Sequence, residues 1–420
     1  MVASAFLLKV SFVLLVPCLV LAQSPRTVYD VRDHGAIGDG HADDTNALVK
    51  AWEATCNAAS PSTMRIPSTM TLLTHPLSFK GPCNHRSVSV EINGDIIGPS
   101  DPSDWRCGDD DCDNWIQFKE VDGLSLFIPL SMQALKIRDS DNVRVTGLSF
   151  KNNPRMHVVF DSLRKLYVSN ITIDAPEDSP NTDGIHISGC TDVFVDHCRI
   201  STGDDCISIV DGSKFVQISN ITCGPGHGIS IGSLGKHGSN DQVEYVQVSD
   251  VVFTKGATNG ARIKTWQYHR RHKLLESMLV DLLRFPRKDL STPELVYEFN
   301  FIFTCNQGGK GYARHILFER ILSQGSKNPV IIDQFYCDHE DCKTHKSAVH
   351  VSNVTFRQIL GTSMGDTGVK IDCSATVPCT DIVMDNIYLR TKDGKNASSQ
   401  CSNANGRADG KWLPSAPCLN

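Results

Sequence analysis

Three short segments of the sequence carry acidic and basic side chains at nearly equal intervals. They are Asn181-Thr182-Asp183, Gly203-Asp204-Asp205 and Gly226-His227-Gly228. Three carboxyl groups and one imidazole can supply both a proton donor and a proton acceptor. Carboxyl groups that divide these two roles are the equipment for hydrolysing a glycosidic bond. A chain that coils once per interval would stack the three segments into one site.

The chemistry depends on these groups sharing that site. Strands of adjacent coils lie about 4.8 Å apart, so Asp183, the Asp204/Asp205 pair and His227 can meet. Clustered like charges oppose ionisation, which favours one carboxyl group staying protonated as an acid while others act as base. The alternative is that the residues only fill polar turns. A calcium site is a further alternative, but it would need more oxygen ligands than these positions supply.

Two cations follow on the next coil. Alternation along a strand puts Arg262 and Lys264 on the same face. Beside an acidic patch they would suit a substrate that carries carboxylates, which arginine can bind through two hydrogen bonds. A solvated charged face is the alternative. Tyr312 is a candidate for stacking on a sugar or hydrogen bonding to it, with ordinary packing as its alternative.

The interval belongs to a repeat that runs through most of the chain. A short hydrophobic alternation recurs at 142–145, 165–168, 192–195, 215–218, 245–248, 315–318, 348–351 and 381–384. Most spacings are roughly 22 to 30 residues, the range of one coil in a stacked solenoid. β-branched runs separated by turns, with few helix signals, predict an all-β chain folded as a parallel β-helix. Leucine-rich repeats share the period, but their Leu-x-x-Leu-x-Leu frame is missing.

A solenoid needs a cap at its open end. The residues Asp43-Asp44-Thr45 open a segment that predicts an N-capped helix over 46–56. We interpret this short helix as the N-terminal cap of the coils. The glycine-rich stretch 34–40 before it is interpreted as a loop. A phosphate cradle is a poor alternative, because no lysine follows the glycines and no βαβ context surrounds them.

The composition indicates an exported protein. Lys9 and the short apolar run 10–21, which ends before Ala22, predict a secretory signal over residues 1–22 rather than a membrane anchor. Sixteen cysteines in 420 residues fit an oxidising compartment. The net charge of −6 gives no basic field for nucleic acid. We expect one elongated domain over 23–420, with no membrane or nucleic-acid partner.

Covalent features also fit export. Short disulfide loops are suggested by the close pairs Cys107/Cys112, Cys337/Cys342 and Cys373/Cys379. Permitted N-glycosylation sites begin at Asn170, Asn220, Asn353 and Asn396.

Together, the motifs resemble those of the plant polygalacturonases. The resemblance is carried by Asn181-Thr182-Asp183-Gly184, Gly203-Asp204-Asp205-Cys206, Gly226-His227-Gly228 and Arg262-Ile263-Lys264. Ser179-Pro180, Cys223-Gly224-Pro225 and Ile331-Ile332-Asp333-Gln334 are similar to that family as well. Four motifs in order and at coil spacing make a specific match, which covers most of the mature chain.

The resemblance implies a right-handed parallel β-helix that hydrolyses the α-1,4 links of de-esterified pectin with inversion. It implies that Asp204 is the general acid, that Asp183 and Asp205 activate the water, and that His227 supports the acid. Galacturonate groups would be held by Asn181, Arg262, Lys264 and Tyr312. Cys206 and Cys223 look like the family's disulfide across neighbouring coils.

Two stretches depart from the family pattern. Residues 268–307 carry no strand phrase and separate Gln267 from the glycine-rich turn before Tyr312. We interpret them as an insertion. Because 301–307 is the kind of string that a translated splice acceptor gives, our hypothesis is a retained intron or a gene-model error. Around 124–130 the chain lacks the family's glycine-rich stretch and paired tryptophans. It is therefore expected to lack about one coil, which would disturb the stacking beneath the site.

The sequence thus predicts a secreted, monomeric hydrolase of homogalacturonan in the cell wall, with no metal or organic cofactor. One alternative is a catalytically impaired or pectin-binding relative, because of the two departures. Another is hydrolysis of a different acidic pectic backbone such as rhamnogalacturonan. The cation pair favours galacturonate on both sides of the cut.

Overall fold

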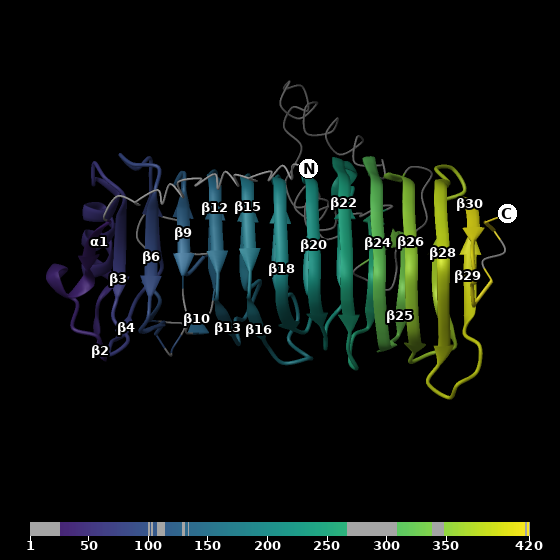
Figure 1. Ribbon diagram of the computed structural model, residues 1–420, viewed down its shortest axis with the longest axis horizontal. Coiled ribbons are helices and arrows are strands. Elements are labelled where there is room, and N and C mark those ends of the chain that lie inside the picture. Colours follow the sequence, from purple (N-terminus) through teal and green to yellow (C-terminus); the bar gives the residue numbers. More distant parts are fainter. Residues whose placement is uncertain are drawn as a thin grey trace, which may run out of the picture.

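The fold is a row of coils stacked along one long axis (Figure 1). The computed structural model describes residues 26–99, 101, 104–106, 114–127, 131–132, 134–266, 309–337, 348–415 and 418–419. Within them the strands form three parallel sheets of 16, 11 and 3 strands. We call these the long sheet, the cleft sheet and the small sheet.

The long sheet runs from one end of the molecule to the other. Its main path is β1 (Thr27–Asp30), β3 (Ser62–Ile66), β6 (Val88–Ile92), β9 (Leu124–Phe127), β12 (Asp141–Thr146), β15 (Arg164–Ser169), β18 (Thr191–Ser201), β20 (Lys214–Cys223), β22 (Asn240–Phe253), β24 (Lys310–Ser326), β26 (His350–Ser363), β28 (Cys379–Thr391) and β30 (Ala404–Asp409). Three short strands pair beside this path: β10 (Ser131–Met132), β13 (Ser149–Lys151) and β16 (Thr172–Asp174).

The cleft sheet is shorter in the strand direction. It consists of β5 (Leu77–Lys80), β8 (Ile116–Lys119), β11 (Leu135–Arg138), β14 (Val158–Asp161), β17 (Ile185–Ser188), β19 (Ile207–Ile209), β21 (Ile229–Leu234), β23 (Asn259–Trp266), β25 (Asn328–Tyr336), β27 (Thr367–Asp372) and β29 (Ser398–Ser402). The small sheet is β2 (Asp39–Asp43), β4 (Thr71–Leu73) and β7 (Asp95–Ile97). Because successive strands alternate between sheets, each coil adds a strand to the long sheet and one to the cleft sheet, whereas the small sheet belongs to the first coils alone. The prediction of a parallel β-helix is confirmed.

The core consists of similar side chains stacked in register. On the cleft sheet one such ladder is Ile187, Ile209, Ile231, Ile263 and Ile332, each paired with the next and fully buried. β-branched side chains suit this position because they pack directly on their cross-strand neighbours. The in-register ladders remove apolar surface from water along the whole axis.

The helix α1 (Thr45–Cys56) covers the N-terminal end, shown in purple in Figure 1. Trp52 packs against Phe79 and Phe118 of the first coils, with ring centroids 5.2 and 5.4 Å away. The capping helix is therefore confirmed. Asp44 stands at the N-cap but makes no side-chain cap bond; its carboxylate instead accepts from the backbone N–H groups of Ile37 and Gly38, which ties down the glycine-rich loop.

Two 3-10 helices are also found in the described part of the chain. They are η1 (Val31–His34) and η3 (Lys236–Gly238). No helix in the described part of the chain is long and apolar enough to cross a membrane.

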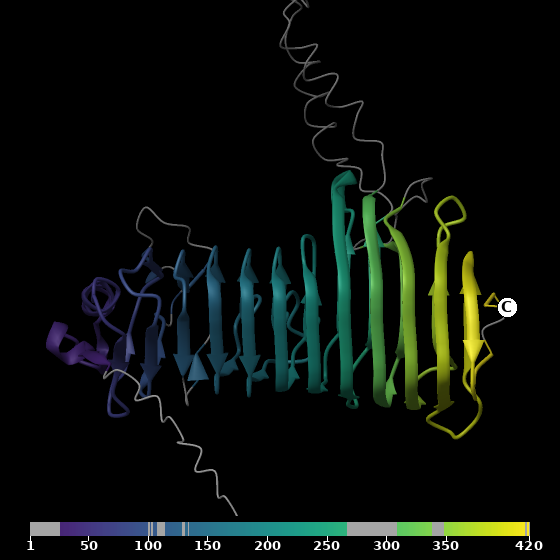
Figure 2. The same cartoon turned by 45° about the horizontal axis from the view of Figure 1, so that its top comes forward.

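The expected disturbance near 124–130 does not occur. β9 pairs with both β6 and β12, and β8 pairs with both β5 and β11. Among the described residues the ladders thus continue in register, and the loss of a coil stays a prediction. A solenoid that lost a whole coil could still stack its remaining coils in this way. Figure 2 shows the same continuous row from a tilted view.

Several predictions fall outside the described residues. These concern the signal at 1–22, the insertion at 268–307, the Cys107/Cys112 pair and Cys342. The Cys373–Cys379 disulfide is present as predicted, and Cys56–Cys83 and Cys401–Cys418 are further bridges. Asn170, Asn220, Asn353 and Asn396 are all exposed, and their glycosylation stays a prediction.

The stacked core predicts a large cost for truncating an inward ring. Phe160 on β14 is fully buried and pairs with Ile137 and Ile187. Phe160→Ala should lower the free energy of unfolding by about 3–5 kcal/mol, since the cavity cannot collapse between two fixed coils. Urea unfolding measures the loss. Phe194→Ala on the exposed face of β18 should cost less than about 1 kcal/mol, and equal losses would contradict this account.

Candidate active site

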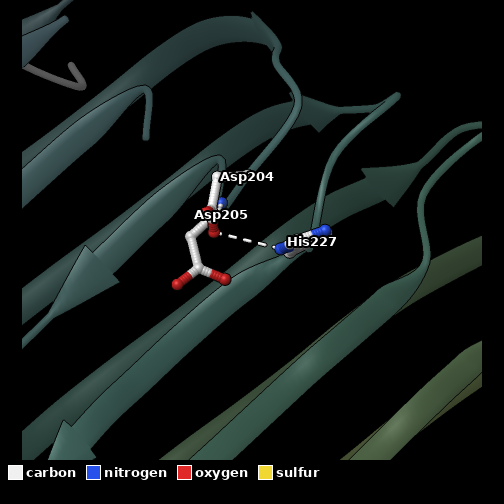
Figure 3. Close-up of side chains that lie close together, drawn as sticks. All are labelled: Asp204, Asp205 and His227. Carbon is white, nitrogen blue, oxygen red and sulfur yellow. Dashed lines mark hydrogen bonds and ion pairs between the residues drawn. The ribbon is translucent and has the colours of Figure 1, made fainter. Parts of the chain in front are cut away.

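The three acidic and basic segments meet at one edge of the cleft sheet. Asp183 directly precedes the turn into β17, Asp204 and Asp205 precede β19, and His227 precedes β21. These strands are neighbours in the sheet, so equivalent positions lie one above another. Figure 3 shows Asp204, Asp205 and His227 close together.

Glycines let the turns that carry these residues lie against one another. Gly228 has a φ of +86°, and a Cβ there would lie 2.3 Å from the carbonyl oxygen of Gly260 on the next coil. A Cβ on Gly203 would lie 2.1 Å from the carbonyl oxygen of Ser179 on the preceding coil. Larger residues would push the coils apart at the site.

Asp204 is held by His227. The His227 Nδ1 atom lies 3.0 Å from Asp204 Oδ1, and because a carboxylate only accepts, the imidazole donates. The same oxygen accepts from the backbone N–H of Asp205 at 2.7 Å. Both contacts orient the carboxyl group through one oxygen.

Asp205 is buried in an ion pair. Lys264 Nζ donates to its Oδ2 at 2.7 Å, and Ser230 Oγ donates to its Oδ1 at 2.6 Å. Arg262 contributes a guanidinium nitrogen 3.7 Å from Oδ1. Asp205 is 1% exposed, so these partners compensate for taking its charge out of water.

Asp183 is held by neutral groups. Its Oδ2 accepts from Ser208 Oγ at 2.7 Å, and Ser208 in turn contacts His186 Nδ1 at 2.7 Å. Its backbone carbonyl accepts from Nδ1 of the buried His157 at 3.2 Å. Burial lowers the pKa of His157 and outweighs that hydrogen bond, so this imidazole acts as a neutral donor.

The pKa values of Asp204 and Asp205 are shifted in opposite directions. Burial alone would raise the pKa of Asp204, but the hydrogen bond and charge of His227, with Lys264, outweigh it and leave the pKa lowered. Burial raises the pKa of Asp205, and repulsion from Asp183 and Asp204 adds to this against the attraction of Lys264. Neighbouring carboxyl groups with separated pKa values are typical of acid–base sites.

The cations face an aromatic ring. Arg262 and Lys264 lie 5.2 and 5.1 Å from the ring centroid of Tyr336, close enough for cation–π attraction. The buried Nε of Arg262 has no hydrogen-bond partner among the described residues. A guanidinium with an unused donor beside a site is suited to an incoming carboxylate.

A cleft of about 940 Å³ adjoins the site on the side of the earlier coils. Asn181, His186, Arg155, Lys136 and Trp105 are among the residues that line it. It therefore combines cations, an aromatic ring and amide groups next to the carboxylates.

The same groups bear on metal binding. Asp204, Asp205 and His227 each offer a ligand atom within 4.8 Å of the others. The carboxylate of Asp205 is already paired with Lys264, and Arg262 lies beside it. Two neighbouring cations disfavour a divalent ion at these atoms.

Comparison with known proteins identifies the family. The profile of the glycosyl hydrolases family 28 matches residues 129–272 and 302–411, more than half of the chain. The chain belongs to this family. Residues 273–301 lie outside the match, within the segment 268–307; the insertion itself stays a prediction.

Known polygalacturonases are similar over most of their length. A polygalacturonase of Persea americana is 38% identical, over 90% of this chain and 78% of its own. A probable polygalacturonase of Arabidopsis thaliana is 37% identical, over 93% and 80%. This family 28 member is accordingly a glycosidase that hydrolyses pectin.

Solved structures share its fold. The polygalacturonase of Erwinia carotovora has a TM-score of 0.63 at 19% identity, covering 93% of this chain and 99% of its own. The endo-xylogalacturonan hydrolase of Aspergillus tubingensis has a TM-score of 0.69 at 19% identity, covering 91% and 100%. At this identity the likeness concerns the fold alone.

The predicted site residues of this family 28 enzyme are largely brought together. The structure clusters Asp183, Asp204, Asp205, His227, Arg262 and Lys264, and it puts Asn181 on the cleft wall. The Cys206–Cys223 disulfide joins the coils beside them, as predicted. Tyr312 lies on β24 of the long sheet, where its hydroxyl bonds Gln242 and its ring lies 4.0 Å from the Arg314 guanidinium.

Other residues of the site were missed by the sequence reasoning. Ser208 and Ser230 touch the two buried aspartates, and Tyr336 faces the cations. The serines could have been found, since each interrupts an otherwise apolar Ile-Ser-Ile strand at the same register. Tyr336 offered no such signal, because it is far from Lys264 in sequence.

The buried ion pair predicts a pH-dependent stability change. Lys264→Met removes the hydrogen-bonded ammonium group from the buried Asp205 carboxylate and leaves Arg262, 3.7 Å away, as its nearest cation. It should lower the free energy of unfolding by about 3–5 kcal/mol at neutral pH. The pKa of Asp205, already raised, rises further without the lysine. A carboxyl group with a raised pKa takes up a proton as the pH falls, so the loss should shrink at acid pH.

Unfolding curves at neutral and acid pH measure this difference. The control is Lys214→Met, which removes a half-exposed partner of Glu244 and should cost less than about 1 kcal/mol. A Lys264→Met loss that grows toward acid pH would contradict the assignment.

Proposed function

We propose that this enzyme hydrolyses the α-1,4-galacturonosyl links of homogalacturonan with inversion of configuration. The observation that carries the proposal is the cluster of three differently held carboxyl groups beside two buried cations. An acid, a water-activating base and a carboxylate-binding pair are the parts that such a reaction requires.

Asp204 acts as the general acid. His227 and the Asp205 N–H engage its Oδ1, which leaves Oδ2 to give a proton to the glycosidic oxygen. Its pKa is lowered in the free enzyme, so it must rise when substrate binds. Galacturonate carboxylates would supply that rise, because added negative charge disfavours ionisation of Asp204.

Asp183 and Asp205 activate the water. Asp183 carries one hydrogen bond from Ser208 on Oδ2, and among the described residues its Oδ1 has no donor. Asp205 has both oxygens engaged by Ser230 and Lys264. We therefore assign proton abstraction mainly to Asp183, with Asp205 orienting the water. The water oxygen bonds to the anomeric carbon as the leaving oxygen takes the proton of Asp204.

The substrate carboxylates are bound by the cations. Arg262 and Lys264 place two positive charges beside Asp205, which would attract a galacturonate carboxylate. Asn181 on the cleft wall would bond a sugar hydroxyl. We also propose that Tyr312 contacts the substrate. Because the Arg314 guanidinium covers one face of its ring, we expect this contact to involve the ring edge or hydroxyl rather than stacking on a sugar.

The site of action follows from the same chemistry. A pectin hydrolase meets its substrate in the plant cell wall, and disulfides such as Cys206–Cys223 persist in that oxidising compartment. We propose a secreted, monomeric enzyme whose signal is residues 1–22.

Replacing the acid tests the proposal. Asp204→Asn should lower kcat on polygalacturonic acid by about 10²–10⁴-fold with little change in KM, because the amide binds similarly but donates no acidic proton. Reducing ends released per time measure the rate. An inactive parent protein, or an active Asp204→Asn variant, would contradict the assignment.

The stereochemistry of the reaction is tested separately. NMR of the first product should show the β-anomer; an initial α-anomer would exclude inversion.

The lowered pKa of Asp204 predicts a shape for the pH profile. The dependence of kcat/KM reports the free enzyme, whereas that of kcat reports the substrate complex. Activity needs Asp204 protonated, so kcat/KM should fall as pH rises through an acidic range. The fall of kcat should lie at higher pH, since bound carboxylates raise the pKa of the acid. Coincident profiles would show that the substrate charge does not act on Asp204.

A further inference from the structure

His186 reaches the base through one serine. It lies on β17, three residues after Asp183, and its Nδ1 is 2.7 Å from Ser208 Oγ on the neighbouring strand. Ser208 Oγ is 2.7 Å from Asp183 Oδ2, and Nδ1 itself is 3.9 Å from that oxygen. Ser208 is 2% exposed, so its hydroxyl is shielded from bulk water.

The positions of the protons in this series of hydrogen bonds follow from the carboxylate at one end. A carboxylate can only accept, so the Ser208 hydroxyl gives its single proton to Asp183. The hydrogen bond between Ser208 and His186 must then be donated by His186 Nδ1–H. If the imidazole carried its proton on Nε2 alone, Ser208 would turn toward Nδ1 and leave Asp183 without its donor.

The two water-activating carboxylates are therefore held in different ways. Asp205 is held by Ser230 and Lys264, which place positive charge on it. Ser208 and Ser230 occupy paired positions on β19 and β21, but among the described residues only Ser208 is hydrogen-bonded to a histidine. Among the described residues only one carboxylate oxygen of Asp183 accepts a hydrogen bond from a side chain, whereas both oxygens of Asp205 are engaged.

We propose that His186 is a positioning residue for Asp183 in the hydrolysis proposed above, acting through Ser208. Its Nδ1–H fixes the serine hydroxyl, and the hydroxyl fixes the carboxylate toward the water. His186 also lines the cleft, with its side chain 18% exposed. A sugar hydroxyl that donates to Nε2 would hold the proton on Nδ1, so a bound substrate reinforces the orientation of the base.

Substitutions that mimic only one of the two ring nitrogens of His186 test this role. His186→Gln places an amide near the Nε2 position and should lower kcat by about 10- to 100-fold, the effect of one hydrogen bond to a charged group, with KM little changed. His186→Leu should do the same. His186→Asn keeps a donor near the Nδ1 position and should recover most of the loss. Equal impairment of the Asn and Leu variants would overturn the proposal.

A double-mutant cycle tests the path through Ser208. Ser208→Ala alone should lower kcat to a similar degree, and adding His186→Leu should cause little further loss because the histidine then has nothing to act through. Full additivity would overturn the proposal. The matched control is His197→Leu, on the exposed side of β18, which should leave both kinetic parameters unchanged.

A spectroscopic measurement tests the proton position on His186 independently of turnover. The ¹⁵N spectrum of the folded enzyme, recorded where histidine is neutral and assigned with His186→Asn, should show His186 protonated on Nδ1, with a signal that shifts in Ser208→Ala. Protonation on Nε2 alone, unaffected by Ser208→Ala, would overturn the inference even in an active enzyme. A parent protein that releases no reducing ends but shows the Nδ1 signal would overturn the proposed function instead.

Discussion

In-register stacking of parallel coils is the constraint on which the rest of this structure depends. Each coil adds one strand to the cleft sheet, and residues at equivalent positions lie about 4.8 Å apart along the axis. The isoleucine ladder inside and the acid–base residues at the strand edge obey the same geometry. A displacement of one coil by one residue would turn isoleucines outward and separate Asp183 from Asp205.

Stacking also makes a dense group of charges tolerable. Asp183, Asp205, Arg262 and Lys264 are all mostly buried, which is costly for each charge by itself. Opposite charges on neighbouring strands repay part of that cost, and two buried serines supply the remaining hydrogen bonds. The buried charges produce a strong local electric field where a polyanionic chain can enter. Fixed charges act most strongly in such a site because it is shielded from water.

The division of labour among three similar carboxyl groups arises from their surroundings. Asp204 is partly exposed and paired with an imidazole, Asp205 is buried with an ammonium group, and Asp183 accepts from the hydroxyl of Ser208, which in turn contacts His186. In the mechanism proposed above, these different surroundings make three chemically identical side chains an acid, an orienting group and a base. β8 and β9 pair in register with β11 and β12, so the described coils before the site stack normally although the sequence between them departs from the family pattern.

Much of the fold and of the candidate site could be predicted from the sequence. The β-helix, its capping helix and the meeting of Asp183, Asp204, Asp205, His227, Arg262 and Lys264 follow from a repeat whose period equals one coil, because periodicity determines which residues share a face. The disturbed stacking expected near 124–130 was wrong, since spacing alone cannot show how coils close up. Only the tertiary structure decided the contacts of Ser208, Ser230, His186 and Tyr336, and those of Tyr312 on the long sheet. Hydrogen bonds, burial and ring contacts depend on distances of a few tenths of an ångström between neighbouring coils, and no sequence interval encodes these distances.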